Sequence, residues 1–194
     1  MDISRHHPSA AAHRRQQQIE DCLFEKMQHK PYASISVAEL CRQVGISRKA
    51  FYNYYADKDA CFYAIVDRYA QNALLHVATA VPENAGALAH ATALMEYWRA
   101  QKPFWDVVVQ NNLLHFLLLQ GIEYVMTEEK TFMDVLSTPE VKSDVDILCC
   151  YTSIQLTLVL QWYLRGFDTP AEEMALKLLR LVYAPMISWE ETRR

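Results

Sequence analysis

Glycine and proline are scarce in this sequence: its 194 residues include only 4 glycines and 7 prolines. A protein rich in loops, or one built from many short strands, contains more of both. No stretch alternates strictly between apolar and polar residues, whereas long stretches have apolar residues at helical spacing. Because 52% of the residues are hydrophobic, the chain has enough apolar surface for a sizeable core. We therefore expect an all-α protein.

The sequence also lacks the cysteine spacing of a metal site. Its cysteines form no CxxC pair, their number is odd, and they lie in mostly apolar, helical stretches: Cys22, Cys41, Cys61, Cys149 and Cys150. Reduced cysteines of this kind behave as small hydrophobic side chains, so we expect them in the core, with neither a metal nor a cofactor. A thiol sensor at Cys149 and Cys150 is an alternative. Core packing is preferred, because neighbouring helical residues point about 100° apart and a disulfide between them would be strained.

Motifs that indicate catalysis are missing. The sequence has no glycine-rich phosphate loop, no HExxH motif and no GxSxG motif. None of the cysteines has a histidine in a recognisable arrangement. An enzyme is therefore a remote alternative, and we expect a protein that binds and does not catalyse.

Signals for export or membrane insertion are missing as well. Residues 1–18 are polar, unlike a signal peptide. The most apolar run, residues 147–164, is about long enough to span a bilayer, but it contains five polar residues: Thr152, Ser153, Gln155, Thr157 and Gln161. This run is predicted to be a buried helix, and the protein is expected in the cytoplasm without a membrane partner.

Charge is divided unevenly along the chain. Residues 1–58 contain nine Lys or Arg and six Asp or Glu, whereas residues 59–194 contain ten and seventeen. Four of the seven histidines also lie in the first segment. A basic head on an acidic body indicates a polyanionic partner at one end of the molecule.

The helical patterns give the expected organisation: a flexible arm over 1–11, a head over 12–58 and a body over 59–194. The head is predicted to contain helices over about 12–28, 37–44 and 48–55. A further helix starts at about 57 and continues to about 76. The body should then contain helices near 85–100, 103–126, 128–136, 140–165 and 170–188, which makes about nine in total.

The stretch 36–55 has the pattern of a helix-turn-helix. Ser36 and Glu39 form a capping box at the start of its first helix. Cys41 is small where the two helices would cross, and Gly45 tolerates the positive φ of a tight turn. Ser47 is placed to cap the second helix, and Asp57 the helix after it.

The second of these helices is predicted to have two distinct faces. Its inner face would consist of Ile46, Phe51 and Tyr55. Its outer face would present hydrogen-bond donors suited to DNA phosphates and base edges, namely Arg48, Lys49, Tyr52 and Asn53.

The run from Gly45 to Asp59 resembles the signature of the tetracycline-repressor (TetR) family. It has the turn glycine, the short recognition helix, the aromatic cluster of residues 51–55, and Lys58-Asp59 at the start of the next helix. The likeness covers about residues 12–65 and departs from the family pattern at Cys61, where leucine is usual. It implies an N-terminal helix-turn-helix that binds double-stranded DNA, followed by a helical domain for dimerisation and effector binding.

The resemblance also implies roles for single residues. Arg48 and Lys49 would face base edges, and Tyr52 and Tyr54 would bond phosphates. Lys58 would reach a phosphate from the start of its helix. Ser36 would contact a phosphate and also cap its own helix. The residues expected at the DNA are Ser36, Ser47, Arg48, Lys49, Tyr52, Asn53, Tyr54 and Lys58. Core packing of Tyr54, and simple solvation of Lys49 and Asn53, are the alternatives.

The end of the chain is expected to form the dimer. Residues 161–166 and 170–175 are similar to the last two helices of some family members, which pair with their symmetry mates into a four-helix bundle. The apolar stripe of Met174, Leu178, Leu181 and Val182 fits such an interface. We therefore expect a homodimer that binds a palindromic operator.

An effector site is expected among the middle helices, where aromatic rings and a few polar side chains share apolar stretches. The candidates are Trp98, Trp105, His115, Phe116, Gln120, Glu123, Gln155 and Trp162. The effector would be largely apolar, with His115 and Glu123 orienting a polar or cationic group. The predicted function is a repressor that a small molecule releases from its operator. The alternative for these residues is ordinary core packing, in a regulator that needs no effector.

Overall fold

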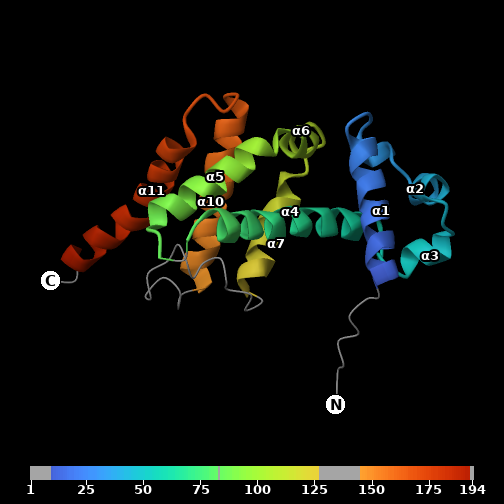
Figure 1. Ribbon diagram of the computed structural model, residues 1–194, viewed down its shortest axis with the longest axis horizontal. Coiled ribbons are helices and arrows are strands. Elements are labelled where there is room, and N and C mark those ends of the chain that lie inside the picture. The colour runs from blue at the N-terminus through green and yellow to red at the C-terminus, as the bar shows by residue number, and fades with distance from the viewer. Residues whose placement is uncertain (1–9, 83, 127–144, 193–194) are drawn as a thin grey trace, which may run out of the picture. The chain divides into compact units, whose positions relative to one another are not determined.

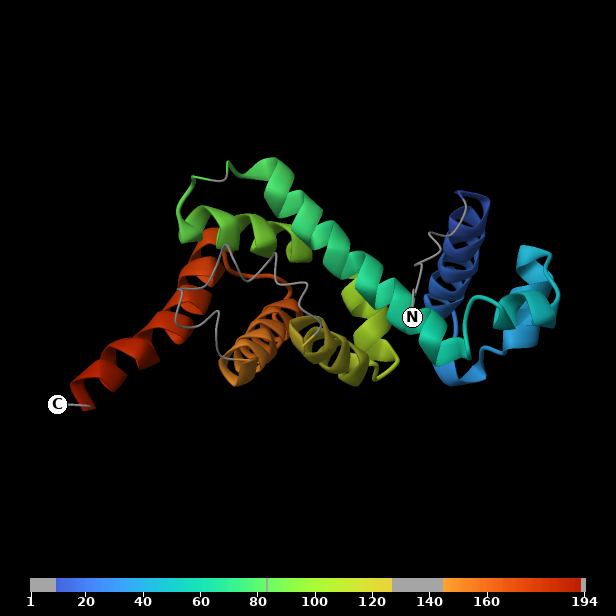
Figure 2. The same cartoon turned by 90° about the horizontal axis from the view of Figure 1, so that it is seen from below.

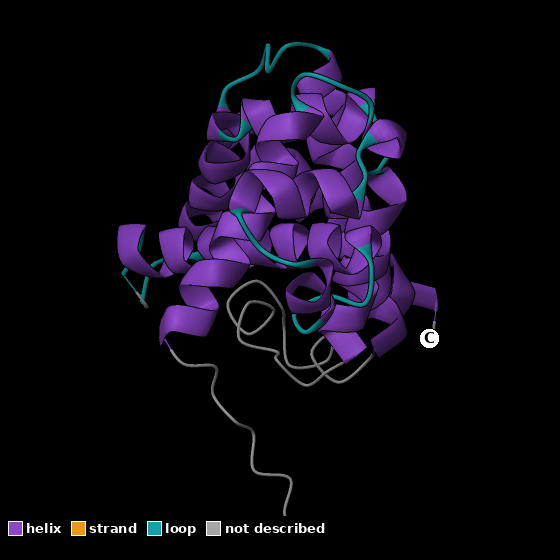
Figure 3. Cartoon of the chain, turned by 90° about the vertical axis from the view of Figure 1, so that its right-hand side faces the viewer, coloured by secondary structure: helices purple, strands orange, loops and turns teal. Residues whose placement is uncertain are grey.

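The computed structural model describes residues 10–82, 84–126 and 145–192, and within these ranges every regular element is a helix, with loops and turns between them (Figure 3). They contain nine α-helices and one 3-10 turn, and no strand. The all-α fold predicted from the scarcity of glycine and proline is therefore confirmed. None of the described helices is both long and apolar enough to cross a membrane.

The chain forms two compact units, residues 1–66 and 67–194, and helix α4 (Lys58–Ala80) continues from the first into the second. The first unit, described from residue 10, contains α1 (Ala10–Met27), the 3-10 turn η1 (Tyr32–Ser34), α2 (Val37–Val44), α3 (Arg48–Tyr52) and the start of α4 (Figure 1). Its core is apolar and drawn from every one of these elements, with Leu23, Leu40, Phe51 and Phe62 fully enclosed.

The capping residues predicted in the first unit are confirmed. Ser36 Oγ accepts a hydrogen bond from Glu39 N, and Ser47 Oγ accepts one from Ala50 N. Asp57 Oδ1 accepts from Ala60 N at the start of α4. Gly45 ends α2 at φ 72°, a left-handed conformation that side chains with a Cβ rarely adopt. Helix α3 is shorter than expected, because it ends at Tyr52 instead of continuing to Tyr55.

The second unit contains the rest of α4 with α5 (Ala87–Ala100), α6 (Lys102–Gln110), α7 (Leu114–Met126), α10 (Val145–Leu164) and α11 (Ala171–Thr192). Helix α5 packs mainly against α11, and α7 packs against α10, as the two perpendicular views show (Figures 1 and 2). Helices α7 and α10 approach very closely at Gly121, where an added Cβ would lie 2.6 Å from Thr152 Cγ2. A larger residue at 121 would require the Thr152 side chain or one of the two helices to shift.

One long helix was expected over 103–126, and this prediction is wrong. The helix breaks between α6 and α7, where Asn112 adopts a left-handed φ of 57°. Asparagine tolerates this conformation better than most residues. Asn111 Nδ2 donates to Val107 O and so supports the end of α6. The helix predicted near 128–136 lies outside the described residues.

The apolar stripe expected at the dimer interface divides between two faces of α11. Met174 and Leu178 are fully buried within the single chain, so their assignment to the dimer interface is wrong. The reason is that α5 already covers this face of α11. Leu181 is 49% exposed and Leu176 is 38% exposed. The side chain of Val182 is not among those described.

The prediction of buried cysteines is correct for Cys22, Cys41 and Cys61, and wrong for Cys150, which is exposed. Its neighbour Cys149 is half-buried. Consecutive helical residues point about 100° apart, and on α10 this rotation places Cys150 on the exposed side of the helix.

Candidate DNA-binding surface

Helix α3 separates its side chains into an anchoring face and an exposed face. Phe51 is fully buried, and Tyr55, just beyond the helix, is buried beside it with the ring centroids 5.8 Å apart. On the other face Arg48, Lys49 and Asn53 are exposed, and Tyr52 is 47% exposed. Tyr54 is half-buried. The exposed face thus presents a guanidinium, an ammonium, a phenol and an amide on about one and a half turns.

The cations of the first unit differ in whether they are paired within it. Arg42, Arg48 and Lys49 are exposed, and in the described part of the chain none of the three makes an ion pair or a side-chain hydrogen bond. Lys26 and Lys30 are instead paired with a carboxylate inside the unit. Unpaired cations therefore lie on α2 and α3, and also on α1, where Arg14 and Arg15 have no ion pair in the described part of the chain. Arg42 was missed by the sequence reasoning, although its place on the polar side of α2 could have indicated it.

Glu39 is the carboxylate that holds the two lysines. Its Oε1 lies 2.9 Å from Lys26 Nζ and its Oε2 lies 2.5 Å from Lys30 Nζ. Hydrogen bonds from Lys30 and Lys26 lower the pKa of Glu39 to about 2. This bridge joins the end of α1 to the first turn of α2, and it neutralises an acid that would otherwise repel DNA phosphates.

A buried pair fixes the far end of α3. Tyr55 Oη donates a 2.7 Å hydrogen bond to Glu20 Oε1, and both side chains are buried. Because Glu20 lies on α1, the bond ties the residues that follow α3 to the helix behind it. It limits how far α3 can tilt.

Lys58, at the first turn of α4, is engaged within the unit. Its Nζ donates to the main-chain oxygens of Tyr32, at 2.7 Å, and Ile35, at 2.9 Å. Burial lowers the pKa of this ammonium, and the neighbouring Asp59 opposes that effect. Tyr32 Oη in turn donates to Asp59 Oδ1. Ser36 and Ser47 each accept the capping bond of their own helix through the hydroxyl oxygen, which leaves the O–H proton as a donor.

Residues 24–65 match the family model described as "Bacterial regulatory proteins, tetR family". The N-terminal unit is a TetR-family DNA-binding domain. The match confirms the resemblance read from the turn glycine and the aromatic cluster, and it makes the chain a DNA-binding regulatory protein. No protein with a curated description matched the chain.

Solved structures share the fold over most of the chain. A TetR-family transcriptional regulator from Syntrophomonas wolfei is 15% identical, with 90% of this chain and 96% of that chain covered and a TM-score of 0.56. A tetR-family regulator from Streptomyces coelicolor is 18% identical, with 91% and 82% covered and a TM-score of 0.52. The dihydroxyacetone kinase operon activator DhaS is 18% identical, with 88% and 95% covered and a TM-score of 0.52. At these identities the likeness establishes the fold alone.

In the second unit, the eight effector candidates lie in different environments. Trp105 and Trp162 are core residues whose indole Nε1 groups donate to Trp98 O and Thr169 O. Phe116 is also buried. Trp98, Gln120 and Gln155 are half-buried, and His115 and Glu123 are exposed.

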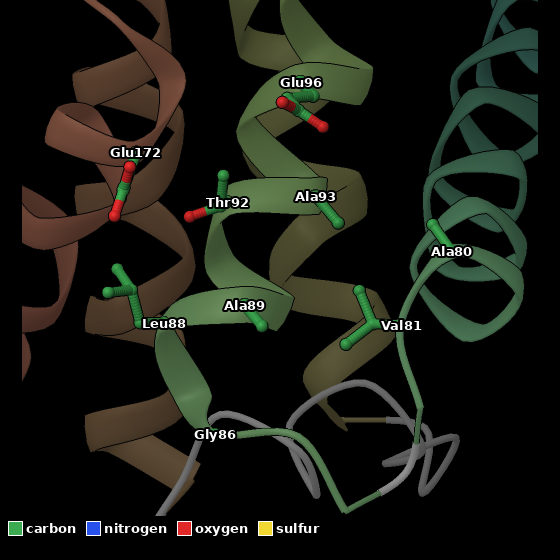
Figure 4. A pocket seen from close by; sticks show the side chains of 9 residues that line it. All are labelled: Ala80, Val81, Gly86, Leu88, Ala89, Thr92, Ala93, Glu96 and Glu172. Carbon is green, nitrogen blue, oxygen red and sulfur yellow. The ribbon is translucent and has the colours of Figure 1, made fainter.

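None of these eight residues lines the open groove that the second unit carries between the end of α4, α5 and α11 (Figure 4). The groove has a volume of about 580 Å³ and an apolar floor, with Glu96 and Glu172 at its edge. The sequence reasoning missed it, because its small lining residues carry no pattern that distinguishes them from helix-packing positions.

Proposed function

We propose that the chain is a repressor that binds a palindromic operator as a homodimer and is released by a small-molecule effector. The observation that carries the DNA-binding part is the unpaired pair Arg48 and Lys49 on the exposed face of α3. A charged group without an internal partner costs little to move onto a phosphate or a base edge. The same helix is anchored by Phe51, so its backbone need not rearrange on binding.

Each exposed residue of this surface has a role that follows from its donor chemistry. Arg48 and Lys49 read base edges in the major groove, where guanine offers two acceptors to such donors. Tyr52 and Tyr54 donate to phosphates, as do Ser36 and Ser47 at the two helix starts. Asn53 pairs with a base or a phosphate at the end of α3. Phosphate contacts fix position, and base contacts supply specificity.

Dimerisation by α10 and α11 is supported by the apolar side chains that these helices leave exposed in the single chain. Leu164, Leu176 and Leu181 are all exposed. A two-fold dimer presents two copies of α3 to successive major grooves, about 34 Å apart or a multiple of that distance. The operator is therefore an inverted repeat.

The release mechanism uses α4, because this helix belongs to both units. An effector in the second unit acts only if it prefers one arrangement of α4 over another. Among the effector candidates, His115, Gln120, Glu123, Gln155 and Trp98 are at least partly accessible to a ligand. Trp105, Phe116 and Trp162 are buried and would affect the site only by supporting the residues around it. The protein acts where its operator is, in the cytoplasm.

Selection from a random duplex library tests the proposal. The expected product is an inverted repeat, with the full repeat bound more tightly than one half-site at equal salt. Selection without enrichment of any sequence would contradict specific binding. Transcription in vitro from a promoter that contains the selected site then distinguishes repression from activation. As a repressor, the protein should lower the transcript yield. A rise would assign this chain an activating role, like that in the name of DhaS.

A further inference from the structure

Lys58 lies where the resemblance places a phosphate contact, but its ammonium group serves an internal purpose. It donates to Tyr32 O at 2.7 Å and to Ile35 O at 2.9 Å. It also lies 4.0 Å from the centre of the Tyr32 ring, a distance at which a cation is attracted to the ring face. Two of its three protons are therefore committed to the segment that joins α1 to α2.

The neighbouring residue holds the same segment from a second side. Tyr32 Oη donates a 2.5 Å hydrogen bond to Asp59 Oδ1, and the Tyr32 ring packs 5.8 Å from the ring of Phe62. Tyr32 is buried although it belongs to a short connection. The first two residues of α4 thus hold both the backbone and the side chain of Tyr32.

The segment held in this way leads directly into the DNA-binding helices. Ile35 is the C-cap of η1, and its own N–H donates to Tyr32 O, so the two carbonyls that Lys58 contacts belong to one turn. The next residue, Ser36, is the N-cap of α2. Helix α2 continues through the tight turn at Gly45 into α3. A shift of the Ile35 carbonyl would therefore move the start of α2 and, with it, the recognition helix.

We propose that Lys58 is a positioning residue. Together with the bond from Tyr32 to Asp59, its bonds to the Tyr32 and Ile35 carbonyls form a clamp that fixes the start of α2 against the start of α4. The clamp sets how α3 meets DNA, and Lys58 does not itself bind a phosphate. This inference rests on the proposed function and assigns Lys58 a role different from the one that the family resemblance implies.

Lys49 provides a matched control, because it is a lysine of the same unit with the opposite surroundings. It is exposed and has no ion pair or side-chain hydrogen bond in the described part of the chain. Replacing either lysine by methionine removes one positive charge and keeps a long side chain. The net charge of the two variants is identical. A difference in their operator affinity or in its salt dependence therefore reports what each ammonium group contacts.

The experiment measures operator affinity as a function of salt concentration for wild type, Lys58→Met and Lys49→Met. Lys58→Met should weaken operator binding about tenfold, the size expected for lost charged hydrogen bonds, without changing the slope of log affinity against log salt. Lys49→Met should reduce that slope by about one phosphate contact if it meets the backbone, or should act only on cognate DNA if it reads a base. A slope for Lys58→Met that falls by about one contact would overturn the proposal, as would unchanged affinity.

A second variant protects the test against a Lys58→Met protein that fails to fold. Tyr32→Phe removes the bond to Asp59 and leaves every charge in place. It should weaken operator binding at unchanged salt slope, and combined with Lys58→Met it should cost less than the sum of the two. Additive effects would show that the two contacts act separately and would contradict a shared clamp.

A measurement without DNA separates this inference from the proposed function. In the free protein, the Nζ nitrogen of Lys58 should show scalar couplings across hydrogen bonds to the Tyr32 and Ile35 carbonyl carbons, whereas Lys49 should show none. Their absence would overturn the clamp even if the protein binds its operator. Couplings in a protein that binds no DNA duplex would support the clamp and contradict the proposed DNA-binding function.

Discussion

Tyr55 and Glu20 are joined by a buried hydrogen bond that links the segment after the recognition helix to α1. Tyr55→Phe removes the hydroxyl and nothing else, and it leaves a buried carboxyl group with one donor fewer. We expect the free energy of unfolding to fall by about 1–3 kcal/mol. Denaturant unfolding followed by circular dichroism measures this change.

Tyr52→Phe is the control for that prediction, because Tyr52 is the last residue of α3, three positions before Tyr55, and is exposed. Its stability should change by less than about 0.5 kcal/mol, while its affinity for DNA falls. Equal losses of stability in the two variants would mean that the hydrogen bond from Tyr55 to Glu20 does not stabilise the unit.

The bridge from Glu39 to Lys26 and Lys30 predicts a dependence of stability on pH. The pKa of Glu39 is lowered to about 2 in the folded protein, from an ordinary value of 4.5. A carboxyl group with a depressed folded pKa stabilises the protein above its unfolded pKa, and the stabilisation is lost as the pH falls through the folded pKa. Glu39→Gln should therefore be less stable than wild type at pH 7. The difference should shrink between about pH 4.5 and pH 2.

Urea unfolding at a series of pH values checks this behaviour. Glu25→Gln, which changes an exposed acid on α1, is the control. A Glu39→Gln variant whose deficit stays constant down to pH 2 would show that the bridge does not stabilise the unit by charge. High salt should also narrow the difference at pH 7, because the bridge is partly open to solvent.

Arg48 is predicted to read guanine. Arg48→Ala should cost about 1–3 kcal/mol on the selected operator and relax the preference at one base pair. Its effect on random duplex DNA should be small. Fluorescence anisotropy with both duplexes, and with 7-deazaguanine at the contacted base, measures these effects. Equal losses on operator and random DNA would reduce Arg48 to a phosphate contact.

Local signals in the sequence were sufficient to predict the helix-turn-helix. Ser36, Gly45 and Ser47 work through bonds to residues no more than five positions away, so their residue types alone indicate the caps and the turn. The partners of Lys58 and Tyr55 are 23 to 35 positions away in the sequence. No local pattern specifies such pairings, and so the clamp at Tyr32 and the bond to Glu20 became visible only in the structure.

The second unit shows a different limit of sequence reasoning. An apolar stripe on α11 predicts burial, but it does not say whether α5 of the same chain or a second chain covers each part. Leu178 and Leu181 lie nearly one helical turn apart, yet the first is fully buried and the second is half exposed. Likewise, the pattern over 103–126 gave no warning of the break at Asn112, since asparagine also occurs inside helices.

The division of α11 into two faces leads to a prediction about the dimer. Leu181→Glu places a charge on the exposed face, where a partner helix is proposed to pack. Because Leu181 has half of its surface free in the single chain, this variant should keep its helical circular dichroism spectrum and sediment as a monomer. Wild-type protein at the same micromolar concentration should sediment as a dimer. The monomer should also bind operator DNA weakly, because one recognition helix meets only one half-site.

Leu178→Ala separates this effect from a simple loss of stability. Leu178 is fully buried against its own chain, so its truncation should lower the free energy of unfolding by about 2–5 kcal/mol. The protein that remains folded should still be dimeric, since α5 covers this face of α11 within the chain. Sedimentation velocity and thermal unfolding of both variants distinguish the two faces. If Leu181→Glu remains fully dimeric, the exposed leucines of α11 do not lie at the interface, and a different surface of the second unit must join the two chains.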